Sequence, residues 1–214
     1  MSKKYIPRFS KNVRIAHWVN VASFMTLVFT GLPLYSETFD FMYYVFGSPA
    51  NTILVHKCAG VIFILPTIFM LLTDPKSFFH WTKTVLSWGS HDFKYFLEFP
   101  KELLGMKSNM PKQDFFNAGQ KLNSLVTILC SIIMVASGLV IWFHTSFPTG
   151  LVQVAHVLHA VGVGLMVPLI MLHIYLSVGH PASRPSFRGM TKGDVDEEYA
   201  KHHHGRWYDE VTNK

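Results

Sequence analysis

Histidines are the residues of this chain whose type and spacing could support chemistry. The 214-residue sequence contains 12 of them, and five lie in or near long apolar stretches. These five are His17, His56, His156, His159 and His173. A single histidine in such a stretch is more often an interhelical hydrogen-bonding residue than a metal ligand. Their mutual arrangement therefore decides what they can do.

Two of these histidines share one apolar stretch, where His159 and His173 are 14 residues apart. On an α-helix this spacing is nearly four turns and about 21 Å, so both side chains lie on one face. In a membrane core of about 30 Å they would lie in opposite halves. His156 does not share this face. We expect His17 at the depth of His173, and His56 at the depth of His159.

Two pairs of facing histidines at two depths are the arrangement that two bis-histidine b haems require. Imidazole is a common iron ligand, and helical bundles hold cofactors between facing helices. Small residues near the pairs would leave room for a flat macrocycle, although small residues also simply allow close helix packing. They are Gly31, Gly60, Gly162 and Gly164, of which Gly31 follows His17 by 14 residues.

Other metal sites are less favoured by the sequence. Zinc gathers three or four ligands at one point, whereas these histidines divide into two distant pairs. The run 202–204 could bind a metal but is also typical of a solvated basic tail, and the roles of His144, His156 and His202 stay open. The two cysteines, Cys58 and Cys130, form no C-x-x-C-H motif and are too few for a cysteine-ligated cluster.

The elements that position the histidines are four apolar helices. Between Arg14 and Glu37 there are 22 residues without formal charge, and 62 such residues run from 122 to 183. A further window, from 54 to 73, is broken only by Lys57. Because a membrane helix needs about 20 apolar residues, the windows 15–36 and 54–73 each hold one span, and the window 122–183 holds two, with a turn near Pro148 and Gly150. We predict an all-α integral membrane four-helix bundle that holds two b haems. Its helices are expected near 15–36, 52–73, 120–144 and 151–179, within one membrane domain covering 1–214.

Composition agrees with a membrane protein. Half of the residues are hydrophobic and only 15% are charged, which argues against an ordinary soluble enzyme. In the four-span arrangement, 18 of the 19 basic residues fall on one side, the cytoplasmic side by the positive-inside rule. Both termini, the connection 74–119 and the tail 180–214 are then cytoplasmic. The net charge of +6 is therefore a topology signal and does not indicate nucleic-acid binding.

The connection between the second and third spans mixes aromatic and charged residues over 76–118. This mixture excludes a fifth span. It is typical of an amphipathic segment at the membrane interface, or of a docking surface.

Seven short segments resemble the cytochrome b (gamma) subunit of membrane-bound respiratory formate dehydrogenases. The more specific ones are Asn-Ala-Gly-Gln-Lys at 117–121 and the tail segment that contains His-His-His-Gly-Arg-Trp-Tyr. The seven segments occupy 14–18, 54–60, 116–121, 137–142, 159–162, 171–175 and 201–208. The resemblance covers most of the chain and is weakest in the loop between the second and third spans.

The resemblance implies four helices, two haem b groups and a menaquinone site. The axial iron ligands of that family correspond in this sequence to the histidines that were selected by spacing. His56 and His159 match the outer haem, and His17 and His173 match the cytoplasmic haem.

The implied quinone pocket adjoins the cytoplasmic haem. It falls on Asn117, Gly119 and Gln120, together with the ligand His173. Asn117 is also a plausible N-cap of the third helix, and both roles can hold together.

The resemblance implies an electron-transfer subunit in the bacterial cytoplasmic (inner) membrane, without catalytic residues of its own. Its expected partners are lipids, an iron–sulfur subunit that donates electrons, and a molybdenum or tungsten subunit that oxidises formate. One alternative is the cytochrome b of a hydrogenase or thiosulfate-reductase-type complex. A second, from another class, is a membrane anchor without cofactor. A transporter is disfavoured because no charged residue lies at a span midplane.

Overall fold

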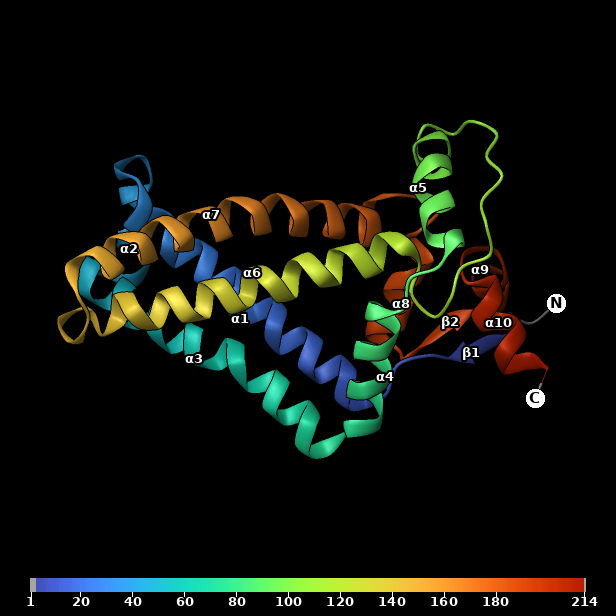
Figure 1. The fold of residues 1–214 in the computed structure, drawn as a ribbon, viewed down its shortest axis with the longest axis horizontal. Coiled ribbons are helices and arrows are strands. Elements are labelled where there is room, and N and C mark those ends of the chain that lie inside the picture. The colour runs from blue at the N-terminus through green and yellow to red at the C-terminus, as the bar shows by residue number, and fades with distance from the viewer. Residues whose placement is uncertain (1–2, 214) are drawn as a thin grey trace. The chain divides into compact units, whose positions relative to one another are not determined.

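The structure, a computed structural model, describes residues 3–213 and consists mainly of helices (Figure 1). Four helices are long and apolar enough to cross a membrane. A helix of 25 residues is about 37 Å long, which exceeds a hydrocarbon core of about 30 Å. The four are α1 (Lys11–Tyr35), α3 (Pro49–Thr73), α6 (Ala118–Trp142) and α7 (Thr149–Ile174). These helices confirm the predicted all-α membrane class with four spans.

The first two long helices begin a few residues before the ranges expected from the charge-free windows. Ser10 caps α1 by accepting a hydrogen bond from the backbone N–H of Val13, and Ser48 caps α3 in the same way from Asn51. A hydroxyl at the N-cap satisfies a backbone donor that the helix leaves unpaired. The cap thus sets where each helix begins, whereas the charge-free sequence windows include only the apolar residues of each helix that can lie in lipid.

The remaining elements are short. A five-residue π-helical turn, η3 (Tyr175–Gly179), continues α7. The segment that mixes aromatic and charged residues contains α4 (Pro75–Leu86) and α5 (Ser90–Leu103), and its role at an interface stays a prediction. The other helical elements are η1 (Glu37–Met42), α2 (Tyr43–Phe46), η2 (His144–Ser146), η4 (Arg184–Ser186), α8 (Phe187–Thr191), α9 (Glu197–His203) and α10 (Gly205–Thr212).

The described chain divides into two compact units. Unit 1 comprises the residues up to 9, 78–132 and those from 164 on, and unit 2 comprises 10–77 and 133–163. Helices α6 and α7 contribute residues to both units. The assignment of the whole chain to one membrane domain stays a prediction.

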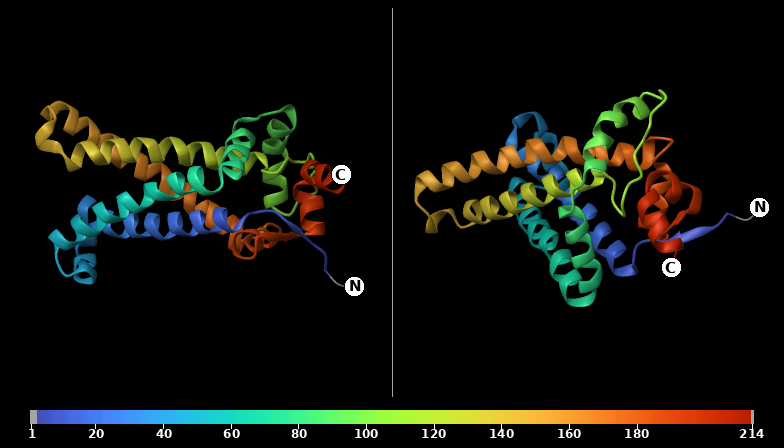
Figure 2. Two further views of the ribbon diagram at one scale, coloured as in Figure 1. Left: turned by 90° about the horizontal axis from the view of Figure 1, so that it is seen from below. Right: turned by 45° about the vertical axis from the view of Figure 1, so that its right-hand side comes forward.

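In unit 2, α1 and α3 pack along each other as an antiparallel pair (Figures 1 and 2). At one end of the pair, the Ser10 hydroxyl donates to the Asp74 carboxylate at 2.6 Å, and the Asn12 amide lies 3.5 Å from the Thr73 carbonyl oxygen. These contacts join the first turn of α1 to the last turn of α3. They fix the register of the two helices and therefore the depth of each side chain along them.

In unit 1, the N-terminal segment pairs with the C-terminal tail. Strand β1 (Tyr5–Pro7) lies antiparallel to β2 (Asp194–Asp196), with Ile6 opposite Val195 (Figure 1). A small apolar core forms behind this pair. Its buried members are Val195, Tyr199, Ala200 and Trp207, and Ile6, Phe115 and Tyr208 pack against it.

Candidate functional site

Two of the four predicted ligand histidines face each other in unit 2. His56 projects from α3 and His159 from α7, with ring centroids 6.4 Å apart and ring planes inclined by 61°. Two imidazoles bound to opposite sides of one ion through bonds of about 2.0 Å place their centroids roughly 6 Å apart. The two rings therefore have the separation needed to share one axially bound metal ion.

A hydroxyl orients each of these rings. His56 Nδ1 lies 2.8 Å from Thr30 Oγ1, and that hydroxyl donates its own proton to the Thr26 carbonyl at 2.7 Å. Because the hydroxyl proton is used in this way, the oxygen is left to accept a proton from Nδ1. The contact then places the lone pair of the neutral ring on Nε2, the atom that a metal would use.

The second ring has the same arrangement. His159 Nδ1 lies 3.0 Å from Ser137 Oγ, and the Ser137 hydroxyl donates to the Ile133 carbonyl at 2.7 Å. Metal-ligating histidines usually donate their other ring N–H to such an acceptor, which fixes the tautomer and the ring orientation. Both rings thus carry the supporting contact expected of an axial ligand.

A glycine also borders each ring. A Cβ atom at Gly31 would lie 3.4 Å from His56 Cε1, and a Cβ at Gly138 would lie 3.4 Å from His159 Cε1. Gly31 was selected by spacing, whereas Gly138 and both hydroxyl residues were missed. A signal was present, because Thr30-Gly31 and Ser137-Gly138 place a hydroxyl directly before a glycine in two apolar stretches.

The other two predicted ligands are placed separately. His17 lies on α1 in unit 2, where its ring packs edge-on against Trp18. His173 lies near the end of α7 in unit 1 and is half-buried. The pairing of His17 with His173 therefore rests on the sequence argument and stays a prediction.

The segment predicted to bind quinone forms the N-terminus of α6. The Asn117 side-chain oxygen accepts from the Gln120 backbone N–H at 2.9 Å, and the Gln120 side-chain oxygen accepts from the Asn117 N–H at 3.1 Å. This reciprocal capping box confirms that Asn117 caps the helix. A Cβ at Gly119 would lie 3.4 Å from Asn117 Oδ1 and 3.6 Å from the hydroxyl oxygen of Tyr95.

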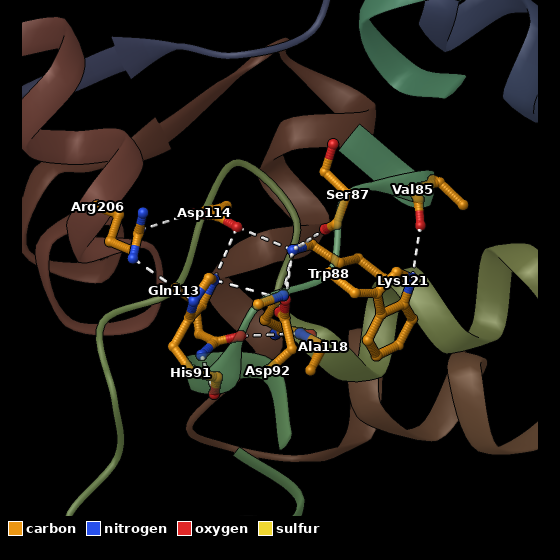
Figure 3. A network of polar contacts seen from close by, with 12 residues as sticks. Val85, Ser87, Trp88, His91, Asp92, Gln113, Asp114, Ala118, Lys121 and Arg206 are labelled. Carbon is orange, nitrogen blue, oxygen red and sulfur yellow. Dashed lines mark hydrogen bonds and ion pairs between the residues drawn. The ribbon is translucent and has the colours of Figure 1, made fainter. Parts of the chain in front are cut away.

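A buried ionic network stands one residue further along α6 (Figure 3). Lys121 is fully buried, and its ammonium group donates to both carboxylate oxygens of Asp92 at 3.0 Å and to Asp114 at 2.8 Å. It also donates to the Ser87 carbonyl at 2.9 Å. His91 Nε2 lies 2.9 Å from the Asp114 carboxylate. The network joins α5, the connection after it and α6 at the segment proposed for quinone.

Sequence reasoning missed this network. Lys121 entered only as one of the basic residues that set the topology and as part of the segment 117–121, without an acidic partner. The signal was its position directly before an apolar run, where a lysine must either reach water or find an acid. Burial raises the pKa of Asp114, but hydrogen bonds from Lys121 and His91 lower it more, so that the pKa of this carboxyl lies below its ordinary value.

The histidine run of the tail is only partly solvated. His202 is exposed, but His204 is fully buried and its Nδ1 lies 2.9 Å from the Asp114 carbonyl oxygen. Burial, reinforced by the Arg8 charge, holds the pKa of His204 well below its ordinary value. The interpretation of this run as a solvated tail is therefore wrong for His204.

Beside it, the Arg8 guanidinium lies 5.1 Å from the ring centroid of Phe115 and 5.3 Å from that of Trp207. Burial lowers the pKa of Arg8 to about 10, so it remains charged at neutral pH. Cation–π contacts of this kind stabilise a guanidinium that has been withdrawn from water.

Comparison with known proteins finds one family and several relatives. The family described as Prokaryotic cytochrome b561 matches residues 8–193. The nitrate-inducible formate dehydrogenase cytochrome b556(Fdn) subunit of Escherichia coli K12 is 26% identical over 99% of this chain and 94% of its own length. The formate dehydrogenase cytochrome b556 subunit of Haemophilus influenzae is 25% identical over 98% of this chain and 85% of its own length. The formate dehydrogenase cytochrome b556(fdo) subunit of Escherichia coli K12 is 24% identical over 96% of this chain and 93% of its own length.

Proposed function

Because the chain belongs to the prokaryotic cytochrome b561 family, we propose that it is the dihaem cytochrome b subunit of a formate dehydrogenase complex, the assembly named in its relatives. It passes electrons from an iron–sulfur subunit, through two b haems, to menaquinone. Formate oxidation belongs to a separate molybdenum or tungsten subunit. This chain is thus an electron-transfer subunit and not the catalytic one.

The facing pair of His56 and His159 is the observation that carries this proposal. Their 6.4 Å ring separation, the two hydroxyls that leave Nε2 as the ligand atom, and the two bordering glycines all fit a bis-histidine haem. A b haem held there supplies reversible one-electron transfer at its iron. A membrane anchor without a cofactor would not need two facing histidines whose tautomers are fixed by hydroxyl groups.

The chain's own residues orient the ligands and exclude water. Thr30 and Ser137 hold the imidazoles in one tautomer and raise their basicity, which lowers the reduction potential of a bound iron. The apolar helices keep the site dry, which also sets that potential. We assign the second haem to His17 and His173, from their matched depth in the sequence.

The quinone site is assigned to Asn117, Gly119 and Gln120, with His173. The capping bonds involve the amide oxygens of Asn117 and Gln120, so their NH₂ groups are the parts that could donate to a quinone carbonyl. Glycine at 119 leaves space that the Asn117 side-chain oxygen and the Tyr95 hydroxyl border, and both are polar groups that could contact a quinone. Substitution there would also crowd Asn117 Oδ1.

The proposed location is the bacterial cytoplasmic membrane, with both termini in the cytoplasm. The basic residues support this orientation. Electrons then enter near His56 and His159 on the outer side, and protons for the quinol are taken up on the cytoplasmic side. Electron transfer in this direction contributes to the membrane potential.

Haem content tests the ligand assignment. A pyridine haemochrome assay on the purified parent should give two haems per chain. His56→Ala and His159→Ala should each lose the same haem, as judged by redox titration, and His17→Ala and His173→Ala should each lose the other. His156→Ala, an exposed neighbour on α7, is the control and should keep both. A colourless parent, or His17→Ala behaving like His159→Ala, would overturn the assignment.

Quinone turnover tests the second site. Asn117→Ala and Gln120→Ala should slow the oxidation of reduced haem by a menaquinone analogue while both haem spectra stay unchanged. Gln153→Ala, which removes an exposed amide side chain on α7, is the control. If both variants react with quinone and bind quinone-site inhibitors as the parent does, these residues serve only as the helix cap.

The nearest alternative is the cytochrome b of a hydrogenase or thiosulfate-reductase-type complex. The haem and quinone chemistry of this chain would be the same in each. Purification of the native complex, followed by identification of its large subunits, separates these donors.

A further inference from the structure

Three side chains outside the membrane helices converge in unit 1. Glu102 lies near the end of α5, and His202 and His203 lie in the last turn of α9. One ligand atom from each lies within 4.8 Å of the other two. None of the three belongs to the proposed haem or quinone sites.

The distances between these groups suit a shared ion better than direct contact. His203 Nδ1 lies 3.9 Å from Glu102 Oε1, which is too far for a hydrogen bond. On a tetrahedral zinc ion with bonds of about 2.0–2.1 Å, two ligand atoms lie roughly 3.3 Å apart. The rings of His202 and His203 have centroids 4.8 Å apart and are mutually perpendicular. A small movement would bring all three groups onto one ion.

The space between them is limited in size. The three side chains line a cavity of about 10 Å³, together with Tyr95, Met110, Pro111 and Gln113. A cavity of roughly 10–15 Å³ accommodates one water molecule. The cavity therefore has room for a single ion or water and none for an organic ligand.

The state of His203 also suits a metal ligand. Burial, with a smaller effect from neighbouring His202, lowers the pKa of His203 to about 4, so the ring is neutral at pH 7. The Tyr199 ring packs against the His203 ring, with centroids 4.5 Å apart, and limits its rotation.

We propose that Glu102, His202 and His203 form a binding site for one divalent transition metal ion. Two imidazoles and one carboxylate, with a fourth position open to water, are a ligand set that zinc favours. The bound ion would fasten α9 to α5. The site does not depend on the proposed electron-transfer function.

Zinc binding by the full chain tests the site. The protein is purified in detergent without a histidine tag, treated with chelator and titrated with Zn²⁺ against a chromophoric chelator. The parent should bind one zinc per chain, and Glu102→Gln and His203→Ala should each weaken binding by at least about 10-fold. His144→Ala, an exposed histidine in η2, is the control and should bind as the parent. Circular dichroism of all variants reports that each keeps its helical fold.

X-ray absorption at the zinc edge supplies a second readout that the haem iron does not obscure. It should show nitrogen and oxygen ligands at about 2.0–2.1 Å, with two imidazoles. Absence of zinc from the titrated parent overturns the proposal. Equal binding by the parent and Glu102→Gln overturns it as well, because the histidine run alone would then hold an adventitious ion.

Discussion

Replacing Lys121 with methionine should destabilise the N-terminal part of α6 severely. The side chains of Lys121 and Asp92 are both fully buried, and the ammonium group makes contacts of 2.8–3.0 Å with Asp92, Asp114 and the Ser87 carbonyl. Methionine preserves most of the volume but leaves the Asp92 carboxylate buried without its cation. Breaking a buried pair by removing one partner costs about 3–5 kcal/mol.

The structure places the expected value at the lower end of that range. Asp92 still accepts from the Gly89 backbone N–H at 2.9 Å, and His91 lies 3.5 Å from the same carboxylate. We therefore expect about 3 kcal/mol, which corresponds to roughly a 10²-fold increase in the local opening equilibrium. The double variant Lys121→Met/Asp92→Asn should be more stable than Lys121→Met, because the uncompensated charge is gone.

Hydrogen exchange followed by mass spectrometry measures this opening in peptides that cover 87–104 and 113–125. The matched control is Lys112→Met, which breaks an exposed ion pair. Lys112 Nζ lies 2.7 Å from Asp209 Oδ2, and the side chains are 66% exposed for Lys112 and 45% exposed for Asp209. Such exposed pairs are worth about 0–1 kcal/mol. A change in exchange of less than about 10-fold in Lys121→Met, or a double variant that opens more readily than the single one, would contradict this expectation.

Three further outcomes follow from the contacts described. Thr30→Val or Ser137→Ala should raise the midpoint potential of the haem proposed for His56 and His159 by on the order of tens of mV in a redox titration, because the ligand loses its hydrogen-bond acceptor; unchanged potentials would show that these hydroxyls do not act on the ligands. Gly138→Leu should remove the haem proposed for His56 and His159 from the absorption spectrum, since even a Cβ at this position would lie 3.4 Å from the His159 ring, whereas Gly150→Leu, with no atom within 4 Å of its Cβ position, should leave the spectrum intact. Because the pKa of His204 is held well below its ordinary value, the unfolded chain takes up a proton below about pH 6.5 that the folded chain does not; the protection of α10 from hydrogen exchange should therefore decrease as pH falls from 7 to 5, and an equal decrease in a His204→Gln variant would assign the effect to another group.

Much of the membrane part could be predicted from the sequence, because its determinants are local. A span needs an uninterrupted apolar length, and the windows 15–36 and 122–183 provide it. The facing of His56 and His159 also followed, since helical periodicity and matched depth leave few other partners at that level. Asn117 as a cap followed from residue type at a helix boundary.

Contacts between distant parts of the chain could not be predicted in this way. Lys121 is buried because Asp92, 29 residues earlier, and Asp114 are brought to its ammonium group. Periodicity cannot distinguish this lysine from a solvated one. The same holds for β1 and β2, whose strands pair Ile6 with Val195 across almost the whole chain.

The sequence by itself determined the number of spans and the candidate ligands, because the bilayer and the helix repeat constrain each residue through its near neighbours. Only the tertiary structure decided which hydroxyl meets each ligand ring, which acids neutralise Lys121, and that His203 comes to face Glu102. Those pairings depend on how helices and connections pack after they form. Many partners are compatible with one local pattern, and burial then selects the arrangement in which polar groups find partners.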